Sequence, residues 1–185
     1  FIDNDEYFPK KQMFDDLDGN FMTNNDERMI FYCKGVIETV RKLGWAPDII
    51  HCQGWFASLV PMYIKKLYAD DPLFENVKVI YSVFDRSFDG VLSDTLPAKL
   101  LYERLEEADV ARIQESNINN LHKFAVDYAD AIVQASPEMD KDVLAHIKSS
   151  EKPFMEYPGD EDYIDAYQDF YSQFIEEEEV VTTED

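Results

Sequence analysis

The chain has 185 residues and a formal net charge of −22, from 39 acidic and 17 basic residues. A surface this acidic repels phosphate backbones, so nucleic acid is excluded as an expected partner. Hydrophobic residues make up 45% of the sequence, which is enough for a core, and the length suits one domain. No apolar run approaches the roughly 18 residues that cross a bilayer, so we expect no membrane partner and a cytoplasmic location.

The sequence opens without a signal peptide, and its first residue is Phe1 rather than Met. We therefore expect that the amino-terminal part of the domain is missing. The two cysteines, Cys33 and Cys52, fall in a helix pattern and a strand pattern, which is typical of reduced core cysteines in a cytosolic protein. No cluster of Cys and His has metal spacing, and no glycine-rich phosphate loop is present, so we expect no metal and no cofactor.

The first quarter of the chain predicts a loop and then one helix. Residues 3–27 are rich in Asp and Asn and indicate a loop. Asn24 followed by Glu27 predicts a capping box at the start of the helix, and Gly44 predicts its left-handed end. Apolar residues recur between them as one stripe at helical spacing: Met29, Cys33, Val36, Ile37 and Val40.

The next segments alternate between strand and helix patterns. A short apolar run from Asp48 to Cys52 ends in a polar cluster with a glycine, which predicts a buried strand and a tight turn. An apolar pattern from Trp55 to Leu67 predicts a helix. The run from Val77 to Phe84 is rich in β-branched and aromatic residues and predicts a second strand, followed by a polar loop.

The alternation continues over the following residues. The pattern predicts two helices and then two strands, over residues 96–107, 117–129, 131–135 and 153–157. Between these two strands, Ser136-Pro137 predicts the start of a helix that runs to about Ile147. Strands that alternate with helices predict an α/β fold, a partial doubly wound, Rossmann-like parallel sheet with helices on both faces.

The last helix has the clearest pattern, an aromatic stripe at helical spacing: Tyr163, Ala166, Tyr167, Phe170, Tyr171 and Phe174. Such a stripe is typical of core packing, and the alternative is a platform for sugar rings. We expect residues 159–175 to be the closing amphipathic helix of the same domain as residues 1–158. From Gly159 onward there are eleven acidic residues and no Lys or Arg, and residues 176–185 are predicted to be an acidic disordered tail.

Polar and aromatic side chains end or follow three of the predicted strands. His51, Gln53 and Trp55 belong to the first strand and its turn, Asp85 follows the second, and Ser136 follows the third. The carboxyl ends of parallel strands meet at one edge of the sheet, where open α/β sheets bind their ligands. We therefore predict that these five residues line one concave surface.

Four segments resemble conserved motifs of bacterial glycogen synthases and plant starch synthases, and they occur in the family order. The segments are 47–55 (P-D-I-I-H-C-Q-G-W, similar to P-D-I/V-I/V-H-x-H-D-W), 25–32 (N-D-E-R-M-I-F-Y, similar to D-N-x-E-R-F-x-F-F), 82–90 (S-V-F-D-R-S-F-D-G, similar to T-I/V-H-N-L-A-Y-Q-G) and 128–137 (Y-A-D-A-I-V-Q-A-S-P, similar to Y-A-D-x-I/V-x-x-V-S-P). The resemblance is nearest to the short glycogen/starch synthase-like proteins of Bacteroidetes.

The resemblance implies two facing Rossmann-like domains of the GT-B glycosyltransferase type, and this chain would be most of the first, acceptor-side domain. It implies glucosyl transfer from a nucleotide sugar, ADP-glucose, to an α-1,4-glucan in glycogen biosynthesis. His51 and Gln53 become the candidate catalytic residues, and the five edge residues become the candidate substrate-binding set. A neutral His51 imidazole would hydrogen-bond a sugar hydroxyl, and the alternative is a half-buried histidine bonded to a neighbouring loop.

The sequence departs from the family pattern at positions where the family has polar or ionisable side chains. Gln53 stands where the family has a second His, Gly54 where it has Asp, and Phe84-Asp85 where it has His-Asn. We expect this chain to be an incomplete or inactive half that needs a partner to supply a second glycosyltransferase domain. The alternatives are a non-catalytic carbohydrate- or partner-binding regulatory module that kept the fold, and a doubly wound domain of unrelated use.

Overall fold

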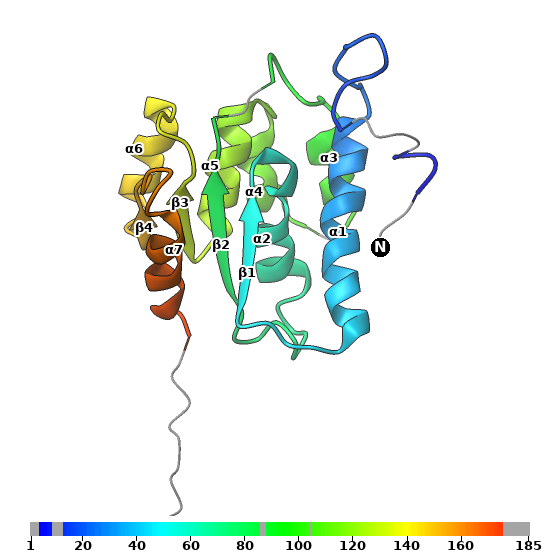
Figure 1. The fold of residues 1–185 in the computed structure, drawn as a ribbon. Coiled ribbons are helices and arrows are strands. Elements are labelled where there is room, and N and C mark those ends of the chain that lie inside the picture. The colour runs from blue at the N-terminus through cyan, green and yellow to red at the C-terminus, as the bar shows by residue number, and fades with distance from the viewer. Residues whose placement is uncertain (1–3, 9–12, 86–87, 104, 176–185) are drawn as a thin grey trace, which may run out of the picture.

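Four parallel strands form one sheet with the order β1-β2-β3-β4 in a computed structural model that describes residues 4–8, 13–85, 88–103 and 105–175. The strands are β1 (Ile49–Gln53), β2 (Lys78–Val83), β3 (Ala131–Gln134) and β4 (Phe154–Met155). The arrowheads of β1 and β2 lie at the same end of the sheet (Figure 1). The predicted α/β fold with a parallel sheet is therefore confirmed.

Helices connect the strands and cover the sheet. They are α1 (Asn25–Leu43), the 3-10 turn η1 (Trp55–Ala57), α2 (Val60–Met62) with its π-helical continuation η2 (Tyr63–Leu67), α3 (Leu96–Leu101), α4 (Glu107–Val110), the 3-10 turn η3 (Ala111–Ile113), α5 (Ile118–Tyr128), α6 (Lys141–Ser149) and α7 (Tyr163–Ser172). The helix predicted over residues 96–107 is thus divided between α3 and α4.

Two helix ends show how far local sequence signals hold. Gly44 ends α1 in the left-handed region at φ 64°, as predicted, whereas the side chain of Asn24 makes no capping hydrogen bond. Helix α6 does not begin at Ser136-Pro137. It begins after Asp140, whose carboxylate accepts hydrogen bonds from the backbone N–H groups of Asp142 and Val143 at 2.8 and 3.2 Å.

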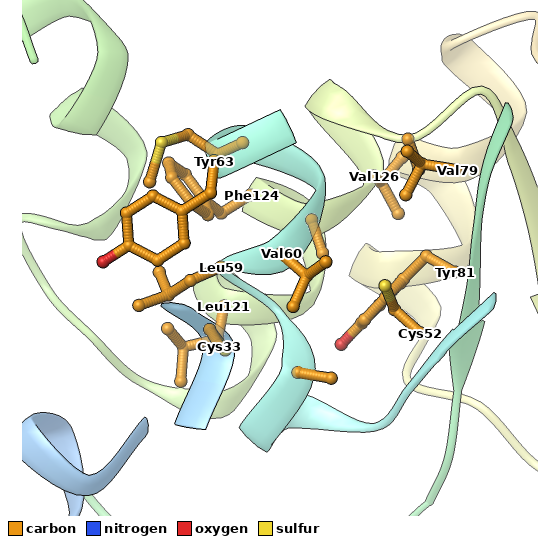
Figure 2. Packing of buried hydrophobic residues seen from close by; sticks show 14 of the residues in the cluster. Cys33, Cys52, Leu59, Val60, Tyr63, Val79, Tyr81, Leu121, Phe124 and Val126 are labelled. Carbon is orange, nitrogen blue, oxygen red and sulfur yellow. The ribbon is translucent and has the colours of Figure 1, made fainter. Parts of the chain in front are cut away.

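The main hydrophobic core lies between one face of the sheet and helices α1, α2 and α5. Val79, Tyr81 and Val83 point into this core from alternate positions of β2. Figure 2 shows Val79 and Tyr81 on the sheet side, with Val60 from α2 and Val126 from α5 between the layers. The remaining residues labelled in Figure 2 belong to the same core: Cys33, Cys52, Leu59, Tyr63, Leu121 and Phe124.

A second, smaller core lies on the other face of the sheet, beneath α7. It contains Ile80, Ala131 and Val133 from the strands and Phe170 from α7, which is only 5% exposed. Tyr167, Tyr171 and Phe174 pack against it and are partly buried. The aromatic stripe is therefore used for packing along one side of α7.

The structure differs from the sequence prediction at the two ends of this helix. Tyr163 is 50% exposed, although it belongs to the aromatic stripe. The helix spans Tyr163–Ser172, which is shorter than the expected 159–175. The predicted acidic tail, 176–185, lies outside the described residues. Among the described residues, no helix is both long and apolar enough to cross a membrane.

Replacing Phe170 by Ala should lower the free energy of unfolding by about 3 kcal/mol, because a buried aromatic ring leaves a cavity beneath α7. Chemical denaturation in urea measures the change. Ile164→Ala is the matched control on the same helix, since Ile164 is 62% exposed and its loss should change stability by less than about 0.5 kcal/mol. Equal effects of the two substitutions would mean that α7 does not pack as described.

Candidate functional site

The carboxyl edge of the sheet brings two of the predicted residues together. The backbone N–H of Asp85 donates to Oγ of Ser136 at 2.9 Å, which ties the segment after β2 to the segment after β3. Gln134, at the end of β3, also contacts this segment: its Nε2 donates to the carbonyl oxygen of Ser136 at 2.9 Å. The Asp85 side chain is exposed there and available as a hydrogen-bond acceptor.

The turn after β1 places Gln53 at the same edge. Gln53 is the last residue of β1 and its side chain is exposed. Gly54 follows with φ 71° and ψ 175°, and its N–H donates to the carbonyl of Ser82 at 3.0 Å. Since non-glycine residues rarely adopt this backbone conformation, an Asp at position 54 would be strained in this turn. The departure from the family pattern at Gly54 thus matches the local backbone.

Trp55 does not join this surface. Its side chain is 5% exposed and lies in an aromatic cluster with Phe14, Phe56 and Phe88, at ring-centroid distances of 4.8, 5.2 and 4.9 Å. The amino-terminal loop supplies Phe14 and so covers the indole. In this structure Trp55 supports the carboxyl edge from inside rather than facing a ligand, unlike the predicted concave arrangement.

His51 occupies the middle of β1 and faces α7. Its Nε2 lies 2.7 Å from Oγ of Ser82, and its Nδ1 lies 2.6 Å from the hydroxyl of Tyr171. The ring of Tyr167 packs beside it at a centroid distance of 5.8 Å. Both ring nitrogens are therefore engaged by hydroxyl groups, which can act as donor or acceptor toward a neutral imidazole. The partners come from a strand and a helix, not from the loop considered as the alternative.

Burial lowers the pKa of His51 from 6.5 to about 4, which keeps the ring uncharged at neutral pH. A neutral imidazole can hold or pass on a hydrogen bond between Ser82 and Tyr171. Of the predicted residues, Gln53 and Asp85 are exposed at the carboxyl edge, and Ser136 is partly exposed beside Asp85.

A groove borders the carboxyl end of β1. It has a volume of about 690 Å³ and runs along α7, with Gln53 as its contribution from the strand. Sequence reasoning did not select Ser82 and Tyr171 as site residues. The sequence signal for Tyr171 was its place in the aromatic stripe, whereas Ser82 carried no signal of its own. No group of three or more His, Cys, Asp or Glu that could hold a metal ion occurs within the part of the chain that the structure describes.

Comparison with known proteins shows the family to which the chain belongs. The sequence pattern of the starch synthase catalytic domain matches residues 1–152. The chain belongs to the starch synthase catalytic domain family. The glycogen synthase of Chlorobium luteolum is 37% identical over 147 residues, which are 79% of this chain and 29% of that enzyme. The glycogen synthase of Chlorobium limicola is 36% identical over 137 residues, or 74% of this chain and 27% of its length.

The chain therefore spans less than a third of the length of these relatives. A solved structure also matches, the catalytic domain of starch synthase IV from Arabidopsis thaliana bound to ADP and acarbose. Its TM-score is 0.58 at 17% identity, and the match covers 82% of this chain and 32% of that one. At this identity the likeness is one of fold. Helix α7 follows residue 152 and so lies beyond the part of the chain that matches the family pattern.

The imidazole of His51 should titrate near pH 4 rather than near 6.5, because α7 buries it. NMR titration of the ring measures this value. As the pH falls from about 6.5 to about 4, His51 is protonated in the unfolded chain but not yet in the folded one. The free energy of unfolding therefore decreases across that window and is unaffected by His51 at higher pH. Tyr171→Phe removes a hydroxyl but keeps the ring, so the pKa should stay low. A chain ending at Gly159 should return it toward 6.5, and a value near 6.5 in the intact chain would contradict burial by α7.

Proposed function

We propose that the chain is the acceptor-side part of a glycogen/starch synthase, with glucosyl transfer from ADP-glucose to an α-1,4-glucan in glycogen biosynthesis as the reaction it serves. The family match over residues 1–152 carries this proposal. The carboxyl edge supports it, because Gln53, Asp85 and Ser136 gather there from three separate family-like segments. We place the chain in the cytoplasm, among the short glycogen/starch synthase-like proteins of Bacteroidetes.

The side chains at this edge suit recognition of sugar hydroxyls. The Gln53 amide offers a donor and an acceptor, the Asp85 carboxylate offers acceptors, and the Ser136 hydroxyl already holds the Asp85 backbone. A side-chain amide does not ionise near neutral pH, so Gln53 would bind and orient a sugar without acid–base chemistry. His51 acts behind it as a positioning residue through Ser82 and Tyr171, and Trp55 supports the turn from the core.

Catalytic turnover requires groups that the carboxyl edge of the sheet does not supply. Stabilising charge on the leaving group is usually the largest catalytic contribution, and a departing diphosphate needs cationic groups. The predicted edge residues are neutral or acidic: His51, Gln53, Trp55, Asp85 and Ser136. We therefore propose that the chain alone does not transfer glucose and that a partner supplies a second glycosyltransferase domain.

The second candidate is a non-catalytic carbohydrate-binding module that kept the family fold. Tyr171 favours it, because its hydroxyl occupies a ring nitrogen of His51 that a sugar hydroxyl would otherwise use. The amino-acid sequence encoded directly upstream of Phe1 discriminates between the two. The glycogen and starch synthases that the sequence resembles carry a K-T-G-G loop near the amino terminus. Such a loop upstream of Phe1 would favour the enzyme half, and its absence would favour the module.

Amide chemical shifts of the isotopically labelled chain test the proposed binding surface. Maltoheptaose, and separately ADP-glucose, should shift Gly54, Asp85 and Ser136. Asp85→Ala should weaken the affinity about threefold to tenfold, as expected for one hydrogen bond. Asp70→Ala, an exposed Asp at the opposite end of β2, should leave the affinity unchanged. Unshifted edge amides with both ligands would refute the site. Incorporation of radiolabelled glucose into glycogen above a no-protein blank would refute the proposed inactivity.

A further inference from the structure

The described residues that line the groove along α7 are all uncharged. The eight described residues that line it are Gln53, Tyr163, Ile164, Tyr167, Gln168, Tyr171, Ser172 and Ile175. The chain around them carries a net charge of −22, so the absence of charge in this lining is a local property. A groove without a Lys or Arg in its described lining, on so acidic a protein, disfavours anionic ligands such as nucleotide sugars.

Helix α7 separates its side chains by chemistry. Phe170 is buried in the core beneath the helix, and Phe174, Tyr167 and Tyr171 pack against that core while partly exposed. Asp165 is exposed, and Asp169 lines a different groove beside β4, so the carboxylates lie away from the tyrosines. The three groove tyrosines are one helical turn apart: Tyr163, Tyr167 and Tyr171. Since the helix rises about 1.5 Å per residue, their rings cover roughly 12 Å along α7.

Two of the three tyrosine rings, those of Tyr167 and Tyr171, are held in place by contacts within the protein. The rings of Tyr167 and Tyr171 meet edge to face at a centroid distance of 5.8 Å. The hydroxyl of Tyr171 is fixed by His51 at 2.6 Å. Tyr163 continues the row and is 50% exposed. A preorganised aromatic row loses little side-chain entropy on binding.

The mixture of groups fits a sugar better than an apolar protein surface. Aromatic rings offer flat apolar faces to the C–H faces of pyranose rings, and phenol groups add polar edges. The amides of Gln53 and Gln168 and the hydroxyl of Ser172 offer donors and acceptors for sugar hydroxyls. Ile164, which is 62% exposed, adds apolar contact area at the rim.

We propose that this groove binds a neutral α-glucan chain laid along α7, at a site that adjoins the carboxyl edge at Gln53 and extends away from it. The choice of an α-glucan among neutral oligosaccharides rests on the proposed function. The site itself rests on α7, which lies beyond the family match at residues 1–152. The sequence left two uses open for the aromatic stripe, and we assign both to it: Phe170 is buried in the smaller core, whereas Tyr163, Tyr167 and Tyr171 line the groove.

Titration of the labelled chain with maltoheptaose tests the groove. Amides of α7 around Tyr163 and Gln168 should shift, and ADP-glucose should leave them unchanged. Tyr163→Ala should weaken maltoheptaose binding about threefold to tenfold, a loss comparable with one hydrogen bond. Tyr163 is half exposed, so its replacement preserves the fold. Tyr102→Ala is the matched control, because Tyr102 is 93% exposed and lies outside the groove, and it should bind as the unmodified chain does.

The outcomes separate the groove from the carboxyl edge. Shifts at Asp85 and Ser136 without shifts in α7 would overturn the groove and leave the proposed function standing. Shifts in α7 alone would support the groove and count against the carboxyl edge. The proposed glucan site would also be refuted if Tyr163→Ala bound maltoheptaose as tightly as the unmodified chain, or if maltoheptaose did not bind at all. The remaining alternative is that a second copy of the chain occupies the groove, and sedimentation velocity tests it. A dimer that Tyr163→Ala dissociates and that maltoheptaose leaves intact would assign the groove to that second copy.

Discussion

Strand β2 sends its side chains into two separate apolar layers, and both layers have to be covered. Val79, Tyr81 and Val83 meet the core beneath α1, α2 and α5, while Ile80 faces α7. A parallel sheet of this kind is stable only when helices shield both of its faces from water. The helices between the strands cover the first face. On the second face, Phe170 of α7 completes the smaller core.

Covering the second face also determines the chemistry of His51. The strand alternation that buries Cys52 in the main core turns His51 toward α7. A polar ring in this layer is acceptable because Ser82 and Tyr171 each occupy one of its nitrogens. The same contact fixes Tyr171 at the wall of the groove. Stability of the second core and the shape of the groove therefore depend on one helix.

The local geometry fits the position at which the sequence departs from the synthase motif after β1. Gly54 adopts a backbone conformation that suits glycine, and Gln53 beside it offers an amide that neither gains nor loses a proton. Together they form a polar, uncharged rim at the end of β1. The tyrosines of α7 continue this rim away from the sheet. The combined surface suits binding of hydroxyl-rich ligands more than proton transfer.

The sequence by itself determined the elements whose signals are local. Helical spacing placed α1, β-branched and aromatic residues placed β2, and Gly44 marked a left-handed helix end, because each signal involves neighbours within a few residues. The tertiary structure decided which side chains meet. Ser136 holds the backbone of Asp85 instead of starting a helix.

Two further placements depended on packing between distant parts of the chain. Trp55 is enclosed by Phe14 from the amino-terminal loop, and His51 meets Tyr171 across 120 residues. The resemblance to synthase motifs indicated the family and the edge residues, but it could not show that α7 covers His51, since α7 lies outside the matched segments. The periodicity of a helix or strand depends on residues that are close in the sequence. Burial and hydrogen-bond partners are determined only when separate elements pack together.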